Sequence, residues 1–338
     1  YEISACLVGS EMCIRDSAFG GDNAPLEVIK GCKIAEENLG VKITLTGNRE
    51  IIERISDENG IDIDGMDIIH TDSVIDIHEK PTEIIKSRKD CSMALGLKAL
   101  CDEGGDAFVS AGSSGALVVG ATFITKRIKG VKRATLAPIL PTAKGRLMLV
   151  DGGANDDCRP EMLLQFGIMA SAYMEKVNGI SKPKVGLVNI GIEDTKGREL
   201  EIEAYKLLKE SELNFCGNLE ARELPKGEFE VAVTDGFTGN VILKLYEGMG
   251  SFFSGKLKEI YGGLAGKLSA MLVYKKIKAF KKAMDYTEEG GAVLLGVNKP
   301  VIKAHGSSDS KAFYNAIRQA KACVDGNVTE TIIKSIEK

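Results

Sequence analysis

One unit recurs along the chain and constrains its fold more than any other feature. The unit is a short β-branched run, then a cluster of Gly, Asp, Asn and Ser, then a helical pattern. Runs such as LMLV and VGLV are apolar at consecutive positions, which is typical of parallel strands covered by helices on both faces. The pattern therefore predicts a three-layer α/β/α fold around a mostly parallel sheet. The β-branched run and the polar cluster that follows it occur together in six segments: 41–48, 106–116, 146–156, 184–197, 229–240 and 301–309.

The helical patterns between these runs are long enough to cover such a sheet. With 338 residues, 44% of them hydrophobic, the chain can bury a large core. Residues 132–141 are a further predicted strand, which ends at prolines. We expect residues 18–338 to form a single α/β/α catalytic domain. Helices are predicted at 24–38, 48–59, 90–103, 114–127, 160–178, 197–211, 308–322 and 328–337.

Residues 241–284 break the pattern, because apolar residues recur there at helical spacing without an intervening strand. Gly262 and Gly263 can turn the chain, so we expect a projecting amphipathic αα-hairpin arm. Between 256 and 282 lie eight lysines and one acid, although the whole chain has a formal net charge of −4. Two interpretations stay open: a helix pair buried in a dimer interface, or an arm that contacts a membrane surface or an acidic partner. The arm residues of interest are Phe252, Phe253, Lys275, Lys276 and Lys278.

Composition excludes several classes of function. The net negative charge gives no case for nucleic-acid binding, which depends on clustered Lys and Arg. The eight cysteines form no C-x-x-C pair and no Cys/His cluster, so we expect free thiols in a reducing cytosol and no metal site. No apolar run approaches the length of a membrane span, and the N-terminus lacks the pattern of a signal peptide. We therefore expect a cytoplasmic protein.

The polar clusters at the strand ends indicate a ligand. In open parallel sheets small molecules bind where strands end and helices begin, because unpaired backbone N–H groups and the helix dipole point there. The chain has no G-x-G-x-x-G after a strand, no G-x-x-x-x-G-K-[ST] and no G-x-S-x-G, so a nucleotide cofactor and a serine nucleophile lack their usual motifs. Small residues with free N–H groups suit a compact anion such as phosphate. We expect no cofactor.

Several side chains at these junctions can act as a general acid, a general base or a charge-stabilising group. Each of them also has a structural explanation. His305 is the one histidine in a Gly/Ser-rich turn, but a histidine can also cap a loop. Asp235 precedes a helical pattern, where a helix N-cap is an equal alternative. Lys196 lies between Thr195 and Gly197 at the start of a helical pattern, where it is either an anion contact or a surface lysine.

Six motifs, in this order and spacing, carry a resemblance that extends from about Phe19 to about Lys321. They are GGDNAP, SAGSSGAL, DGGANDDCRPEMLLQF, NIGIEDTKGRE, TDGFTGNVILK and VIKAHGSSDSKAFYNAIRQA. Together they resemble the bacterial phosphate acyltransferases of phospholipid synthesis, which are acyl-[acyl-carrier-protein]:phosphate transacylases.

The resemblance implies that inorganic phosphate attacks the thioester of a fatty acyl group on acyl carrier protein, giving acyl phosphate. It also implies a fold like phosphotransacetylases and the isopropylmalate-dehydrogenase group, a homodimer, and peripheral contact with the membrane surface. A membrane glycerol-3-phosphate acyltransferase would then consume the product. The basic arm fits an acidic carrier protein and an anionic leaflet.

The site residues follow from the motifs that match. Ser113 and Ser114 stand where the family commonly has Asn-Thr, which keeps hydroxyl groups but loses one amide. The expected catalytic residues are Lys196, Asp235, Asn240 and His305. The expected phosphate- or substrate-binding residues are Asp22, Asn23, Gly112, Ser113, Ser114, Asn155, Arg159, Ser307 and Asp309. Two alternatives stay open: a phosphotransacetylase-type enzyme that uses acyl-CoA, and a non-catalytic anion-binding scaffold at the membrane surface.

The start of the chain departs from the family. The family's first strand resembles I-A-V-D-A-M, whereas this chain has I-R-D-S-A-F, which places Arg15 and Asp16 where a buried strand favours apolar residues. We therefore predict that residues 1–17 are a non-native N-terminal segment, in which CLVGSEMCIRDS resembles a translated sequencing adapter. The alternative is a divergent first strand in which Ile14 alone faces the core.

Overall fold

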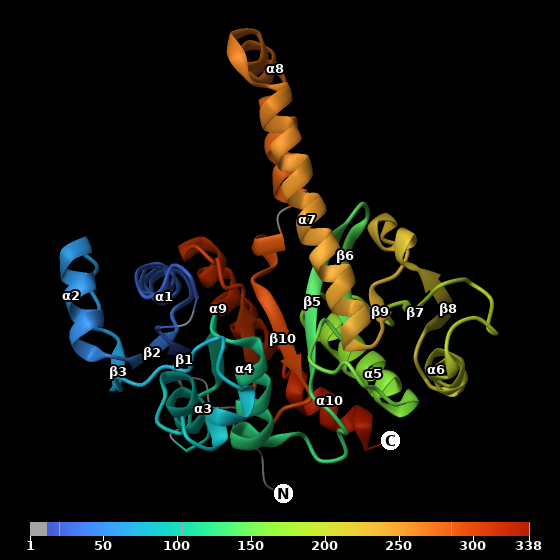
Figure 1. The fold of residues 1–338 in the computed structure, drawn as a ribbon, viewed down its shortest axis with the longest axis horizontal. Coiled ribbons are helices and arrows are strands. Elements are labelled where there is room, and N and C mark those ends of the chain that lie inside the picture. Colours follow the sequence, from blue (N-terminus) through green and yellow to red (C-terminus); the bar gives the residue numbers. More distant parts are fainter. Residues whose placement is uncertain (1–11, 20, 103, 285, 338) are drawn as a thin grey trace, which may run out of the picture. The chain divides into compact units, whose positions relative to one another are not determined.

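A computed structural model describes residues 12–19, 21–102, 104–284 and 286–337 (Figure 1). The contacts divide the described chain into two compact units. The first unit runs up to Lys126 and includes Lys299–Val324, and the second comprises Arg127–Asn298 together with Asp325 onward. The sequence predicted one domain from residue 18 to residue 338. That single catalytic domain stays a prediction, and each unit is described by itself below.

The first unit contains five parallel strands, with the central strand β1 between β2 and β4. In sheet order they are β3 (Asp67–His70), β2 (Lys42–Gly47), β1 (Cys13–Ser17), β4 (Ala107–Ser110) and β11 (Val301–Ala304). Helices α1 and α9 lie on one side of β1 and β2, and α3 lies on the other (Figure 1). The helical segments are α1 (Leu26–Leu39), α2 (Arg49–Asn59), η1 (Pro81–Ile85), α3 (Ser92–Asp102), α4 (Ser114–Gly120), its π-helical continuation η2 (Ala121–Lys126) and α9 (Ser310–Asp325).

The second unit contains six strands, of which β5 is antiparallel to both β10 and β6 and the others are parallel. In sheet order they are β10 (Gly291–Leu295), β5 (Thr135–Thr142), β6 (Gly145–Val150), β9 (Val231–Val233), β7 (Val185–Asn189) and β8 (Phe215–Glu220). The helical segments are α5 (Pro160–Lys176), α6 (Glu199–Glu210), η3 (Ala221–Lys226), α7 (Gly236–Ile260), α8 (Gly263–Met284), η4 (Tyr286–Glu289) and α10 (Val328–Ile336).

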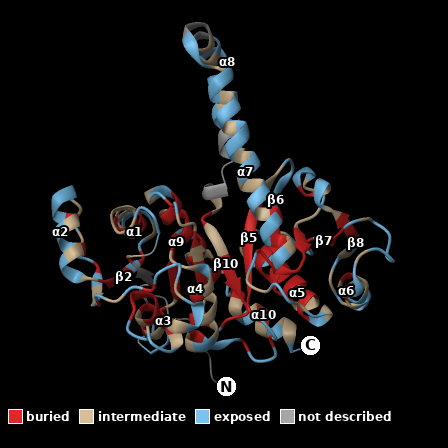
Figure 2. Cartoon of the chain, viewed as in Figure 1, coloured by how far each residue is buried: buried red, intermediate tan, exposed pale blue. Residues whose placement is uncertain are grey.

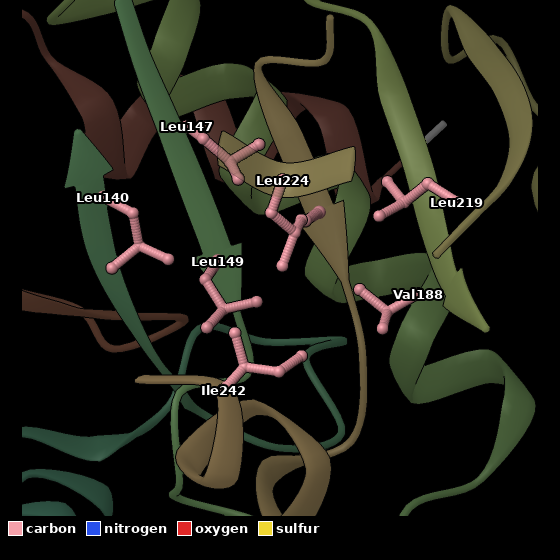
Figure 3. Packing of buried hydrophobic residues seen from close by; sticks show 8 residues of the cluster. Leu140, Leu147, Leu149, Val188, Leu219, Leu224 and Ile242 are labelled. Carbon is pink, nitrogen blue, oxygen red and sulfur yellow. The ribbon is translucent and has the colours of Figure 1, made fainter. Parts of the chain in front are cut away.

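The strands of the second unit are covered on both faces, as their apolar runs predicted. Alternate side chains of β6, such as Leu147 and Leu149, pack with Ile242 of α7 and Leu224 of η3 (Figure 3). On the other face α5 packs against β9, where a Cβ on Gly167 would lie 3.4 Å from Val233 Cγ2. The strands are buried along most of their length (Figure 2), so this unit is a three-layer α/β/α structure.

The predicted helical hairpin is confirmed, with different bounds. Helix α7 ends at Ile260 and α8 begins at Gly263, so the chain turns at the predicted glycines. However, α7 begins at Gly236, five residues before the predicted start at 241, because the Asp235 side chain caps it there. Much of the hairpin surface is exposed (Figure 2).

The predicted helices are all present, but the sequence pattern missed three of the strands. The six predicted β-branched runs coincide, to within one residue at either end of the strand, with β2, β4, β6, β7, β9 and β11, and the 132–141 run coincides in the same way with β5. Strands β3, β8 and β10 were not predicted. Of the predicted non-native segment, residues 1–11 lie outside the described residues. The backbone of Cys13–Ser17 forms β1 in register with β2 and β4, and the Ile14 side chain is fully buried. The non-native origin of this segment stays a hypothesis.

Candidate functional site

The loop after β6 is folded around one buried carboxylate. Asp151 is fully buried, and its Oδ1 accepts hydrogen bonds from the backbone N–H groups of Leu136 (3.2 Å), Gly153 (3.0 Å) and Ala154 (2.9 Å). Its Oδ2 accepts from the backbone N (2.8 Å) and Nδ2 (2.7 Å) of Asn155. Burial raises the pKa of Asp151, while these hydrogen bonds act in the opposite direction. The carboxylate therefore fixes the backbone of the DGGAN motif.

Helix α7 begins directly against this loop. The Asp235 side chain accepts a hydrogen bond from the Thr238 backbone N at 2.7 Å, which is an N-cap interaction. The backbone N–H of Gly236 donates to the Asn155 carbonyl oxygen at 2.6 Å. A Cβ on Gly239 would lie 1.8 Å from the Asp151 carbonyl oxygen, so only glycine fits there. The first turn of α7 and the DGGAN loop are thus held in close contact.

Gly239→Ala should lower the free energy of unfolding, toward the upper end of the roughly 1–3 kcal/mol typical of overpacked cores. The added methyl group collides with backbone, which cannot rotate away. Gly248→Ala is the matched control, because Gly248 lies in the same helix with open space around its Cβ position. Alanine there should stabilise the helix by up to about 1 kcal/mol. Urea titration of both variants measures the difference, and equal stability of the two would contradict the close approach.

A cavity of about 590 Å³ opens where the loop meets the helix. The helix N-terminus brings partial positive charge to it. Asn240 is exposed, and its side-chain amide makes no hydrogen bond within the described residues. Lys244 brings a full positive charge, and its Nζ lies 2.8 Å from a Glu247 carboxylate oxygen. The cavity is lined by Gly153, Ala154, Asp156, Gly236, Phe237, Asn240, Val241 and Lys244.

The Asp235 carboxylate is fully engaged. It is 2% exposed, accepts from Thr238 Oγ1 at 3.1 Å, and forms an ion pair with Arg198. Arg198 also pairs with Glu201, and these two carboxylates raise its pKa. The geometry thus agrees with the N-cap alternative for Asp235. Its predicted role in proton transfer stays a prediction.

The other predicted site residues of the second unit differ in their contacts and exposure. The Asn155 amide donates to the Ala134 carbonyl oxygen at 2.8 Å as well as to Asp151, so it holds the loop. Arg159 and Lys196 are both exposed, and their side chains form no ion pair within the described residues. Neither lines the 590 Å³ cavity. Their charges are available to an anionic ligand, and their predicted roles are untested.

The predicted residues of the first unit form a second cluster. A Cβ on Gly21 would lie 2.8 Å from the Gly306 carbonyl oxygen and 3.1 Å from Ala111 Cβ, so the loops after β1, β4 and β11 meet there. Asn23 Nδ2 donates to the Ser307 carbonyl oxygen at 3.2 Å. His305 Nδ1 accepts from the Ser307 backbone N–H at 3.2 Å and lies 2.8 Å from Ser307 Oγ.

Hydrogen bonds also place the remaining residues of this cluster. The Asp22 backbone N–H donates to the Gly306 carbonyl oxygen at 2.7 Å. The Asp309 side chain accepts from the Ala312 backbone N–H at 2.8 Å, and Ser113 Oγ accepts from the Ala116 backbone N–H at 3.4 Å. Gly112 precedes Ser113, and Ser114 is the first residue of α4. The structure therefore brings the predicted GGDNAP, SAGSSGA and HGSSD loops together. Whether these residues bind phosphate is untested.

The sequence prediction missed Asp151, Arg198, Phe237 and Lys244. Asp151 opens the DGGAN motif that was singled out, so a signal for it was present. Arg198 lies within the NIGIEDTKGRE motif, but its pairing with Asp235 joins residues 37 positions apart. No group of three or more metal-ligating side chains is present among the described residues. The described helices include none long and apolar enough to cross a membrane.

Cys158 borders the site but is a poor nucleophile. Burial, followed by the nearby Asp151 carboxylate, raises its pKa to about 12, so the thiol stays protonated at neutral pH. We expect iodoacetamide at pH 8 to alkylate Cys158 more slowly than the exposed Cys216, measured by peptide mass spectrometry. Rapid, complete labelling of Cys158 would contradict this environment.

Comparisons with known proteins show which family and which fold the chain is similar to. The family model described as "Fatty acid synthesis protein" matches residues 14–331. A protein named "Phosphate acyltransferase" from Clostridium botulinum is 47% identical over 323 residues, covering 95% of this chain and 96% of the relative. A protein of the same name from Alkaliphilus oremlandii is 49% identical over 326 residues, covering 96% and 97%. A solved phosphotransacetylase from Streptococcus pyogenes has a TM-score of 0.63 at 16% identity, covering 97% of this chain and 95% of that one. This likeness confirms the predicted phosphotransacetylase-like α/β fold.

Proposed function

Since the chain belongs to the fatty acid synthesis protein family, we propose that it transfers a fatty acyl group from acyl carrier protein to inorganic phosphate. The products are an acyl phosphate and the free carrier thiol. The observation that carries the proposal is the cavity at the start of α7, where a helix N-terminus, an unpaired amide and a lysine converge. The names of the relatives, which are almost half identical over nearly the whole chain, support the transfer of an acyl group to phosphate.

The reaction needs no covalent intermediate on the protein. A phosphate oxygen forms a bond to the thioester carbon, the carbonyl oxygen gains negative charge, the C–S bond breaks, and the thiolate takes up a proton. Donors fixed in advance around the developing oxyanion lower the barrier. We assign this role to the Asn240 amide, aided by the N-terminus of α7 and the charge of Lys244. The poor nucleophilicity of Cys158 agrees with direct attack by phosphate.

The remaining roles are those that the family resemblance implies. Lys196 would help to stabilise the oxyanion. His305 or Asp235 would manage the proton that the thiolate takes up. Asp22, Asn23, Gly112, Ser113, Ser114, Asn155, Arg159, Ser307 and Asp309 are the proposed phosphate- or substrate-binding residues.

The hairpin is the proposed contact with the donor protein and the membrane. Phe252 is 53% exposed and Phe253 is 42% exposed, and Lys275, Lys276 and Lys278 are exposed on α8. Apolar and basic groups together suit an anionic surface, whether a leaflet or an acidic carrier protein. We further propose a cytoplasmic homodimer that works at the membrane surface. It would deliver acyl phosphate to a membrane glycerol-3-phosphate acyltransferase for phospholipid synthesis.

One assay tests the proposal and its nearest alternative. The purified protein is incubated with orthophosphate and either an acyl-carrier-protein thioester or the matching acyl-CoA, and acyl phosphate is trapped with hydroxylamine. We expect orthophosphate-dependent hydroxamate, with the carrier-protein thioester as the better donor. A preference for acyl-CoA would favour the phosphotransacetylase-type alternative, and no product from either donor would favour the non-catalytic scaffold.

A further inference from the structure

Besides the hairpin, the second unit has another basic surface, in the segment before β5. Four of the seven residues 127–133 are Lys or Arg and none is acidic, although the whole chain has a formal net charge of −4. Lys132 Nζ lies 3.6 Å from a Glu161 carboxylate oxygen, and the other three cations form no ion pair among the residues that the structure describes. We call this segment the basic loop. Its cations are Arg127, Lys129, Lys132 and Arg133, and all four are exposed.

Buried side chains and hydrogen bonds hold the basic loop in place. Ile128 is 2% exposed and Val131 is 6% exposed, so the exposed cations alternate with buried anchors. The Gln165 side chain of α5 binds the backbone at two points. Its Oε1 accepts from the Lys132 backbone N–H at 2.8 Å, and its Nε2 donates to the Gly130 carbonyl oxygen at 2.9 Å. The loop therefore presents its charges on a preformed surface, which lowers the entropic cost of binding a partner.

The basic loop leads directly to the wall of the 590 Å³ cavity. Ala134 follows Arg133 in the chain, and its carbonyl oxygen accepts a hydrogen bond from Asn155 Nδ2 at 2.8 Å. Asn155 belongs to the DGGAN loop, whose Gly153 and Ala154 line the cavity. Arg133 is therefore adjacent to a residue that is bonded to the cavity wall.

The chemistry of the basic loop suits an acidic protein better than a lipid surface. Segments that bind anionic membranes combine cations with apolar side chains that enter the lipid. Both apolar side chains of the loop are buried, which leaves charge alone on its surface. Clustered charge guides an oppositely charged protein to a surface and sets its orientation. The hairpin has exposed apolar groups as well, but α7 is 25 residues long, so its far end lies about 37 Å from its start at the cavity.

We propose that the basic loop is the docking surface on which the acidic carrier protein sits while its thioester reaches the cavity. The inference rests on the proposed function, because it names the surface that brings this donor to Asn240. Carboxylates of the carrier protein pair with Lys129 and Arg133, which have no ion pair among the described residues. Since these pairs form at an exposed surface, the affinity should fall as the ionic strength rises. Docking of this kind changes the affinity for the donor and leaves the chemical step unchanged.

Charge reversal at two positions tests the docking surface. Lys129→Glu and Arg133→Glu each remove an exposed cation and break no ion pair among the described residues. Lys176→Glu is the matched control, because Lys176 is also exposed and without an ion pair in the described part of the chain, but lies about 16 Å along α5 from Gln165. Binding is measured by the fluorescence anisotropy of labelled holo carrier protein. We expect the Kd to rise about 5- to 10-fold in each loop variant, with a weaker salt dependence, and to stay unchanged in Lys176→Glu.

Kinetics separate docking from chemistry. In the two loop variants the KM for the acyl-carrier-protein donor should rise while kcat stays unchanged. Turnover of an acyl thioester of N-acetylcysteamine, a small uncharged donor, should match the wild type, which also shows that the variants are folded.

The outcomes distinguish this inference from the proposed function. Unchanged carrier binding in both loop variants, in preparations that form acyl phosphate, would overturn the docking surface and leave the proposed function intact. An equal loss in Lys176→Glu would also overturn it. If the loop variants lose binding to vesicles that contain phosphatidylglycerol but keep carrier binding, the loop contacts the membrane instead. If no donor yields acyl phosphate but carrier binding falls only in the loop variants, the proposed function fails and the docking surface stands.

Discussion

Replacing Asn240 by Ala should lower kcat/KM for acyl phosphate formation by about 10²- to 10³-fold, the loss typical of removing one oxyanion donor. The amide lies in the cavity at the start of α7 and has no other partner within the described residues. Under the proposed role of Asn240, its loss removes stabilisation from the transition state and breaks no hydrogen bond within the described residues. The hydroxylamine assay, run at substrate concentrations well below KM, measures this change in kcat/KM.

Two comparisons make the Asn240 result interpretable. The free energy of unfolding should hardly change, because Asn240 is exposed and alanine favours a helix. Asn240→Asp keeps the shape but replaces the donor with a negative charge, so it should be at least as inactive as Asn240→Ala. Near-wild-type turnover in either variant would remove Asn240 from the oxyanion site.

Asp151→Ala should lower the free energy of unfolding by about 3–5 kcal/mol, because several buried N–H groups lose their acceptor at a cost of about 1–3 kcal/mol each. The substitution leaves the buried N–H groups of Leu136, Gly153, Ala154 and Asn155 without their acceptor. Activity should fall as well, because the loop that these bonds hold forms one wall of the cavity. Urea unfolding at neutral pH is the measurement.

Asp151→Asn separates the loss of hydrogen bonds from the loss of charge. It keeps the volume and one acceptor oxygen, so its destabilisation should be smaller than that of Asp151→Ala. Burial raises the pKa of Asp151 in the folded protein, so the folded state binds more protons than the unfolded state near that pKa. This group's contribution to stability should therefore decline as the pH rises through its folded-state pKa. Asp151→Asn should lose that dependence, and an unaltered pH profile would argue against a raised pKa.

The sequence was most informative where local chemistry decides the outcome. Gly262 and Gly263 predicted the turn of the hairpin, and LMLV predicted a strand buried on both faces; both are confirmed. It was least informative for β3, β8 and β10, short strands whose pairing depends on distant neighbours. It also left two roles open for Asp235, and the ion pair with Arg198 across 37 residues is not visible in a local pattern.

By itself, then, the sequence determined the α/β class, the hairpin and the loops at which chemistry is expected, because periodicity and turn residues act over a few positions. Only the tertiary structure decided which of those loops meet. The contact of Gly239 with the Asp151 carbonyl oxygen and the ion pair of Arg198 with Asp235 bring together residues that lie far apart in the chain. Such contacts are set by the packing of the helix against the sheet, which no local pattern encodes.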